Sequence, residues 1–259
     1  LVGCVHLDVS PGIVAGTSAI AAGVTAEALF TTWVTRPVVQ SNLRHTTSAD
    51  ERLSLRAFFS FYIPLAITPL MTLVLQPIGA LAMNRMTAPK TSLAAWTVVY
   101  GLIFLTRSAG FAFNEVVVTL CQEPGARAAL QRVAWLLGAA MVGALALIAF
   151  TPVAGLYFVH ATDLSPDVYP VAVTAVGLGL LMSGYAVLQS LYQGYLVAHR
   201  RTWYATEAVA IYLTIAMALL AASVAWSPWP GVHSAILSLS VAGICQTLWL
   251  RWRSATLRR

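Results

Sequence analysis

The chain has 259 residues, of which 59% are apolar and 9% are charged, whereas a typical soluble domain is about 25% charged. This composition excludes a sizeable soluble domain and predicts an all-α integral membrane protein, because a membrane span needs about 20 mainly apolar residues. The net charge of +6 does not indicate nucleic-acid binding, since the basic residues are scattered over short loops and the tail.

Seven segments are long and apolar enough to be transmembrane helices: residues 11–34, 57–82, 93–120, 130–152, 168–197, 203–226 and 231–250. The three cysteines lie far apart without a CxxC motif, and the five histidines lie near span ends or in loops. Neither a metal site nor a disulfide framework is predicted. No catalytic motif is found either, so we do not expect an enzyme.

Basic residues predict the orientation of these spans. Most of them lie in the loops 36–56, 121–132 and 198–202 and in the tail, whereas the alternate connections hold only Arg85 and Lys90. The positive-inside rule then predicts a multi-pass protein of the plasma membrane with an external N-terminus and a cytoplasmic C-terminus.

The first predicted span aligns without gaps with the last: "SAIAAGVTAEALFTTWV" at 18–34 with "SAILSLSVAGICQTLWL" at 234–250. Either two spans share small residues and a tryptophan by chance, or each ends a six-helix bundle. The chain also starts without a methionine or a signal pattern. We therefore hypothesise the C-terminal part of a longer transporter, with four segments: the last helix of a first bundle (1–35), a cytoplasmic linker (36–56), a complete six-helix bundle (57–252) and a basic cytoplasmic tail (253–259).

The predicted span 57–82 carries Pro64, Pro69 and Pro77. Each proline removes a backbone donor and clashes with the preceding turn. A broken helix at membrane depth is tolerated where protein or a water-filled cavity surrounds it. The prolines therefore either make a packing kink or let a cavity-lining helix bend during gating, and three in one span favour the second interpretation.

One face of the next predicted span carries Trp96, Tyr100, Ile103, Arg107, Gly110 and Asn114, at steps of three and four residues. Arg107 lies near the middle of its span, where insertion costs about 2.5 to 3.5 kcal/mol. It is therefore expected to face the bundle interior or water. There it either binds an anionic cargo group or forms a structural ion pair with Glu27, Glu115 or Glu207.

Glu115 lies about 80° around this helix from Arg107 and about 12 Å further along its axis, so it is expected to face elsewhere. It either binds a proton or a sodium ion, because burial makes its charge switchable, or extends to the cytoplasmic interface. Asn114 is either a cargo ligand or a contact between helices, and Gly110 permits close approach.

Polar residues also share a face of the span 168–197, namely Tyr185, Gln189, Tyr192 and the neighbouring Gln193. Polar side chains bond helix to helix in membranes for about 1 kcal/mol. This face is therefore either a packing interface or a cavity wall, and Gln189 is its candidate ligand-binding residue.

The segment "FYIPLAITPLMTLVLQPIGALAMNR" resembles the opening helix of the second bundle in the multidrug, oligosaccharidyl-lipid and polysaccharide flippase superfamily, with its start at Pro64 to Ala66 and the proline-isoleucine pair at Pro77. The spacing is most similar to the progressive ankylosis protein branch and the multidrug and toxic compound extrusion transporters. "GFAFNEV" at 110–116 is similar to a glutamate-containing stretch of that branch, although the distance to the preceding span differs. The resemblance covers mainly residues 57–120.

The resemblance implies two six-helix bundles around a cavity that opens alternately to each side. It implies a secondary active exporter or antiporter of an anionic or amphiphilic solute, coupled to H⁺ or Na⁺ and without another cofactor. The expected partners are the lipid bilayer and this solute, and the expected state is a monomer. Two alternatives stay open: a lipid-linked oligosaccharide flippase, and a non-transporting receptor or scaffold in which the polar stripe is helix packing.

Overall fold

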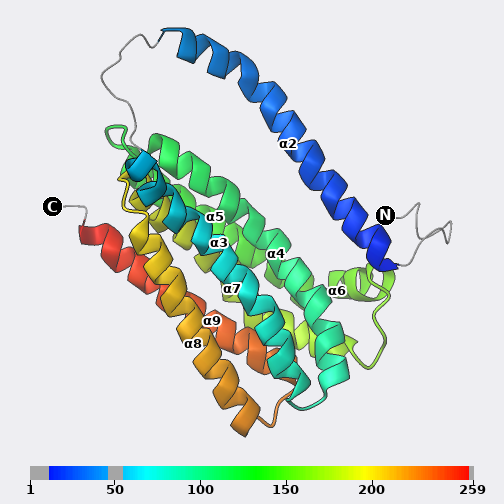
Figure 1. The fold of residues 1–259 in the computed structure, drawn as a ribbon. Helices are drawn as coiled ribbons and strands as arrows, with labels where there is room; N and C mark the ends of the chain where they lie inside the picture. Colours follow the sequence, from blue (N-terminus) through cyan, green and yellow to red (C-terminus); the bar gives the residue numbers. More distant parts are fainter. Residues whose placement is uncertain (1–11, 46–54, 257–259) are drawn as a thin grey trace. The chain divides into compact units, whose positions relative to one another are not determined.

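The computed structural model describes residues 12–45 and 55–256, and the chain divides into two units, Leu1–Ser54 and Leu55–Arg259 (Figure 1). The described part of the first unit is one helix, α2 (Gly12–His45). This helix contains residues 12–34 of the predicted span 11–34 and continues through Arg36 and Pro37. The predicted linker 36–56 is therefore helical as far as residue 45, residues 46–54 lie outside the described residues, and residues 55–56 begin the next helix.

The second unit consists of helices joined by short turns. They are α3 (Leu55–Asn84), α4 (Pro89–Leu120), α5 (Ala126–Phe150), the short α6 (Val153–Gly155) with the π-helix η1 (Leu156–Ala161), α7 (Tyr169–Ala198), α8 (Trp203–Trp226) and α9 (Gly231–Ala255). In the described part of the chain, six helices are long and apolar enough to cross a membrane: α3, α4, α5, α7, α8 and α9. Helix α2 is not among these six, so the predicted number of seven spans is not confirmed.

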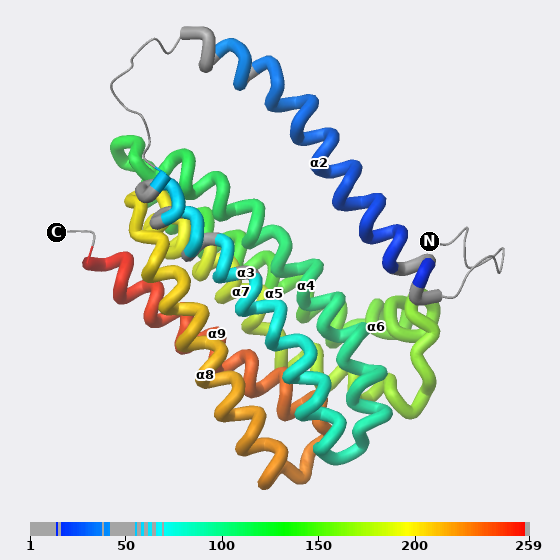
Figure 2. The backbone as a smooth tube through the Cα atoms, in the orientation of Figure 1, coloured from blue at the N-terminus to red at the C-terminus, as the bar shows by residue number. Residues whose placement is uncertain are grey.

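These six helices run alternately in opposite directions (Figure 2). The central helix is α7, which packs on α4, α5 and α9, whereas α3 packs chiefly on α8. At one end, Gln122 Nε2 donates to the Ala198 carbonyl oxygen at 3.3 Å. At the other, the Gly231 amide donates to the Thr87 carbonyl oxygen at 3.1 Å. Connections far apart in sequence therefore meet at the two ends of the bundle.

Apart from Arg107 in the middle of α4, the described basic residues of the bundle lie toward one or the other of these two ends. The end with Gln122 and Ala198 also carries Arg127, Arg132, Arg200, Arg201, Arg251 and Arg253, while Arg85 and Lys90 lie toward the other end. This is the asymmetry on which the predicted orientation rests. Which end faces the cytoplasm stays a prediction.

Small residues bring the helices close together. A Cβ atom at Gly110 of α4 would lie 3.2 Å from the backbone of Ala186 and Val187 in α7, and one at Gly138 of α5 would lie 3.2 Å from the Gly184 carbonyl oxygen. In a bilayer the packing of helices depends on such close backbone approach, because lipid tails are as apolar as the side chains. The α4–α7–α5 layer is therefore held by backbone contact.

Large apolar side chains cover the outside of the bundle. Leu105, Leu136, Leu147, Phe150 and Leu181 are each more than half exposed. In water, so much exposed apolar surface would drive association, whereas in lipid it is the expected exterior. The bundle therefore has the surface of a membrane protein.

Helix α3 continues through positions 64, 69 and 77 without interruption, so the prolines do not divide this span into separate helices. Neighbouring helices and side chains can satisfy the backbone groups that a proline frees in a membrane helix. The side chains of Pro64 and Pro69 lie outside the described residues, and Pro77 is exposed. Their role in bending stays a prediction.

Candidate functional site

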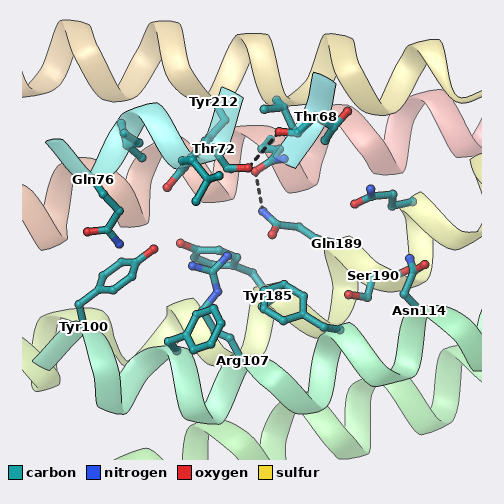
Figure 3. Close-up of a pocket in the computed structure, with 18 of the residues that line it drawn as sticks. Thr68, Thr72, Gln76, Tyr100, Arg107, Asn114, Tyr185, Gln189, Ser190 and Tyr212 are labelled. Atoms are coloured by element: carbon teal, nitrogen blue, oxygen red, sulfur yellow. Dashed lines mark hydrogen bonds between the residues drawn. The ribbon is translucent and has the colours of Figure 1, made fainter. Parts of the chain in front are cut away.

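A cavity of about 610 Å³ lies among α3, α4, α7, α8 and α9 of the second unit (Figure 3). Its apolar lining consists of Leu73, Leu75, Phe104, Phe111, Ala186 and Val209. Its polar and charged lining consists of Thr68, Thr72, Gln76, Tyr100, Arg107, Asn114, Glu115, Tyr185, Gln189, Ser190, Gln193, Tyr212 and Gln246. Polar residues thus outnumber apolar ones in the lining, although the surrounding helices are apolar.

The predicted stripe on α4 is divided between this cavity and the core. Tyr100, Arg107 and Asn114 line the cavity. Ile103 is fully buried and Gly110 packs on α7. Trp96 does not line the cavity either: it is 7% exposed and stacks on Tyr100 with 4.8 Å between the ring centroids. The predicted stripe therefore marks the boundary of the cavity face.

The observed cavity face of α4 is rotated from the predicted one. Phe104, Phe111 and Glu115 line the cavity together with Arg107, so the expectation that Glu115 faces elsewhere is wrong. The physical reason is the close approach at Gly110, whose Cβ position is 3.2 Å from the α7 backbone. This contact turns the other edge of α4 toward the cavity.

Arg107 has few partners for a charged side chain at membrane depth. Within the described part of the second unit it forms no ion pair, because the salt bridge found there joins Arg253 to Glu207. The Arg107 Nε atom is buried without a hydrogen-bond partner, and its guanidinium carbon is 5.9 Å from the centroid of the Phe111 ring. The predicted pairs with Glu115 and Glu207 are therefore not formed.

Amide side chains of the lining also hold helices together. Asn114 Nδ2 donates to the Ser190 carbonyl oxygen at 3.0 Å. Gln189 Nε2 donates to the Gly243 carbonyl oxygen at 3.1 Å and to Gln246 Oε1 at 3.0 Å. Asn114 and Gln189 thus each line the cavity and also bond one helix to another, two roles between which the sequence alone did not decide.

Tyr185 occupies space that a glycine of α9 leaves free. Its hydroxyl group donates to the Leu239 carbonyl oxygen at 3.4 Å. A Cβ atom at Gly243 would collide with this hydroxyl group and its ring. Tyr192, from the same predicted polar face, is buried outside the cavity at 6% exposure.

The cavity is lined in part by α3, the helix for which the sequence favoured a cavity-lining role, but its lining residues were not identified from the sequence. Thr68, Thr72 and Gln76 recur every four residues and point into the cavity from one side (Figure 3). This spacing is a helical signal that the prolines concealed. Tyr212 of α8 and Gln246 of α9 were not identified from the sequence either.

Arg253 provides a second arginine site, near the end of α9. Its Nη2 atom donates to Glu207 Oε1 at 2.9 Å and to Oε2 at 3.1 Å. Its guanidinium carbon lies 4.5 Å from the centroid of Tyr204, 4.9 Å from that of Trp249 and 4.8 Å from that of Trp252. This arginine is enclosed by aromatic faces and neutralised by a carboxylate.

No family model, curated protein or solved structure matches the chain. The resemblance to the flippase superfamily, drawn from motifs in 57–120, therefore stays a prediction. Among the described residues, no group of three or more histidine, cysteine, aspartate or glutamate side chains is placed to hold a metal ion. The chemistry that the cavity offers is that of hydroxyl groups, amides, aromatic faces and the two charges of Arg107 and Glu115.

Proposed function

We propose that this protein is a secondary active transporter that exports an anionic or amphiphilic solute across the plasma membrane by alternating access. The observation that carries the proposal is Arg107, which lies on the wall of a cavity of about 610 Å³ between membrane helices and forms no ion pair with the described residues of its unit. This volume lies within the range of about 300 to 1,000 Å³ found for small-molecule sites.

The energetic argument starts from the cost of a charge at membrane depth. An arginine at a helix centre costs about 2.5 to 3.5 kcal/mol on insertion scales. A structural role would be expected to lower this cost with a carboxylate, as Glu207 does for Arg253. Arg107 instead lines the cavity, where a carboxylate or phosphate can accept charge-assisted hydrogen bonds from its guanidinium group.

The other predicted residues receive roles around this contact. Asn114 and Glu115 would hydrate the cavity or bind the coupling proton or sodium ion, and Gln189 would line the cargo path. Helix α3 is the candidate gating helix, since it forms one cavity wall and packs chiefly on α8. Bending at Pro64, Pro69 and Pro77 would then open the cavity on one side.

The motif resemblance supports the same function through the two-bundle architecture of the flippase superfamily. A lipid-linked oligosaccharide flippase is less well supported, because the described lining contains one arginine. A non-transporting receptor or scaffold is supported by the bond from Asn114 to Ser190, which is a helix contact. Accessibility of position 114 separates transport from packing.

The test is the labelling of Asn114→Cys in membrane vesicles by a membrane-impermeant maleimide, added separately from each side. Cys4, Cys121 and Cys245 are first replaced by serine. Burial raises the pKa of the Cys121 thiol, and the nearby Arg127 lowers it less, so Cys121 by itself would react slowly. The matched control is Val117→Cys, because Val117 lies on the same helix and is fully buried.

Alternating access predicts that the cysteine at position 114 reacts from both sides and that the one at 117 reacts from neither. Reaction of position 114 from one side alone would contradict transport and leave a receptor. If neither position reacts with the maleimide, the polar stripe on α4 serves helix packing and does not face a water-filled cavity.

A further inference from the structure

The cavity carries one charge of each sign. Among its described lining residues, Arg107 is the cation and Glu115 is the carboxylate, and both lie on α4. Neither forms an ion pair within the described part of the second unit. A carboxylate on the wall repels a simple anion at close range, so Glu115 needs a cation beside it, either the coupling ion or a positive group of the cargo itself.

The two charges are too far apart to neutralise each other directly. They are separated by eight residues of α4, which is about 12 Å along the helix axis. In Figure 3, Arg107 lies with Tyr100 and Gln76 toward one end of the cavity, and Asn114, the neighbour of Glu115, lies with Ser190 toward the other. The cavity is therefore electrically polarised along its length.

The wall between the charges is largely apolar. Phe111 lies between Arg107 and Glu115 on α4, and Phe104, Leu73 and Val209 also line the cavity. Tyr100, Tyr185 and Tyr212 add ring faces with hydroxyl groups. Such a wall suits an extended body with few charges of its own, held by contact with aromatic and aliphatic side chains.

Resting on the transport function proposed above, we infer that the cargo is an elongated dipolar solute, with a carboxylate or phosphate at Arg107 and an ammonium group at Glu115. A simple anion alone would leave Glu115 without a counter-charge, and a simple cation would leave Arg107 without one. A solute with both charges about 10 Å apart satisfies both side chains in one bound pose.

The experiment compares three probes of matched length on the full chain in lipid nanodiscs: ω-aminooctanoate, octanoate and octylammonium. Isothermal titration calorimetry measures the dissociation constant of each. Because a charge-assisted contact is added at one end, ω-aminooctanoate should bind about tenfold more tightly than either singly charged probe. Glycine carries both charges at short separation and should bind no better than octanoate.

Two neutralising variants assign the contacts. Glu115→Gln should abolish the preference for ω-aminooctanoate over octanoate, and Arg107→Gln should abolish its preference over octylammonium. The matched control is Glu123→Gln, since Glu123 is exposed in the turn after α4 and does not line the cavity. This control should leave both preferences unchanged.

Equal binding of octanoate and ω-aminooctanoate, an unchanged preference in Glu115→Gln, or binding of none of the probes would overturn the inference. Its failure is distinguishable from failure of the transport proposal. If octanoate and ω-aminooctanoate bind equally and Asn114→Cys is labelled from both sides, the protein is an anion transporter without a preference for dipolar cargo. A dipolar preference together with one-sided labelling leaves a dipolar-ligand receptor.

Discussion

Arg107, on the cavity wall, and Arg253, near the end of α9, have different surroundings. Arg253 lies 2.9 Å from Glu207 and within 5 Å of three aromatic ring centroids. Arg107 has one ring at 5.9 Å and no ion pair within the described part of its unit. The first is near a helix end with other basic residues, and the second is in the middle of α4.

This difference distinguishes an arginine that stabilises the fold from one whose charge is available to a ligand. Cation–π contacts contribute about 0.5 to 2 kcal/mol each, according to exposure, so Arg253 gains its partners when the bundle folds. Arg107 gains little on folding and retains an uncompensated desolvation cost. Such a cost at a cavity wall is expected where the compensation comes from a ligand.

The largest expected effect is that of Arg107→Gln on transport. Export of an anionic or dipolar solute by proteoliposomes should fall by about ten- to hundredfold, because charge-assisted hydrogen bonds to the cargo are lost. The midpoint of thermal unfolding should not fall, since the variant removes an unpaired charge. Undiminished export with a lowered midpoint would show that Arg107 stabilises the fold, as Arg253 does, and does not contact the cargo.

Arg253→Gln should show the reverse pattern. Its free energy of unfolding should fall by about 1 to 3 kcal/mol, because the contacts with Tyr204, Trp249 and Trp252 are lost and Glu207 loses its partner. Export per folded molecule should stay unchanged. Denaturant titration in detergent measures the first quantity, and a loss of export at full stability would contradict the assignment.

Gln189→Leu should affect both properties, since Gln189 lines the cavity and bonds to α9. Loss of its hydrogen bonds should lower the free energy of unfolding by about 1 kcal/mol, with a several-fold weaker binding of ω-aminooctanoate. Calorimetry and denaturant titration on the same preparation check the two effects. If only ligand binding changes, Gln189 serves the cavity alone. If only the free energy of unfolding changes, Gln189 serves helix packing alone.

The smallest effect is expected for Glu207→Gln, about 0.5 kcal/mol in the free energy of unfolding. The side chains of Arg253 and Glu207 are 24% and 32% exposed, and pairs of this kind contribute little. A double-mutant cycle with Arg253→Gln isolates the pair from the aromatic contacts. A coupling energy as large as the whole Arg253 effect would show that the aromatic rings contribute nothing.

Sequence patterns predicted the bounds of the long bundle helices well, because these depend mainly on the length and polarity of each segment. The predicted span 203–226 coincides with α8, and the starts and ends of the other bundle helices were predicted within about five residues. Helix α2 continues through Arg36 and Pro37, beyond the end of the predicted span 11–34. A charge and a proline usually end a span, but neither forces the helix itself to end there.

The candidate site was only half predictable. Arg107 was recognisable because a charge at mid-span has a cost that no position in a soluble helix carries. The face to which it belongs was not, since 96, 103 and 110 lie beside 100, 107 and 114 on the helix surface. Contact of Gly110 with the α7 backbone decided between the two edges.

By itself, the sequence determined that this protein is a bundle of apolar membrane helices with an arginine at membrane depth, because hydrophobic length and the cost of a buried charge are local properties. Tertiary structure decided that Arg107 and Glu115 share one cavity and that Glu207 pairs with Arg253 instead. It also brought Gln189 to Gly243, 54 residues away. Helix rotation and distant partners depend on which backbones approach each other, and no local pattern encodes that choice.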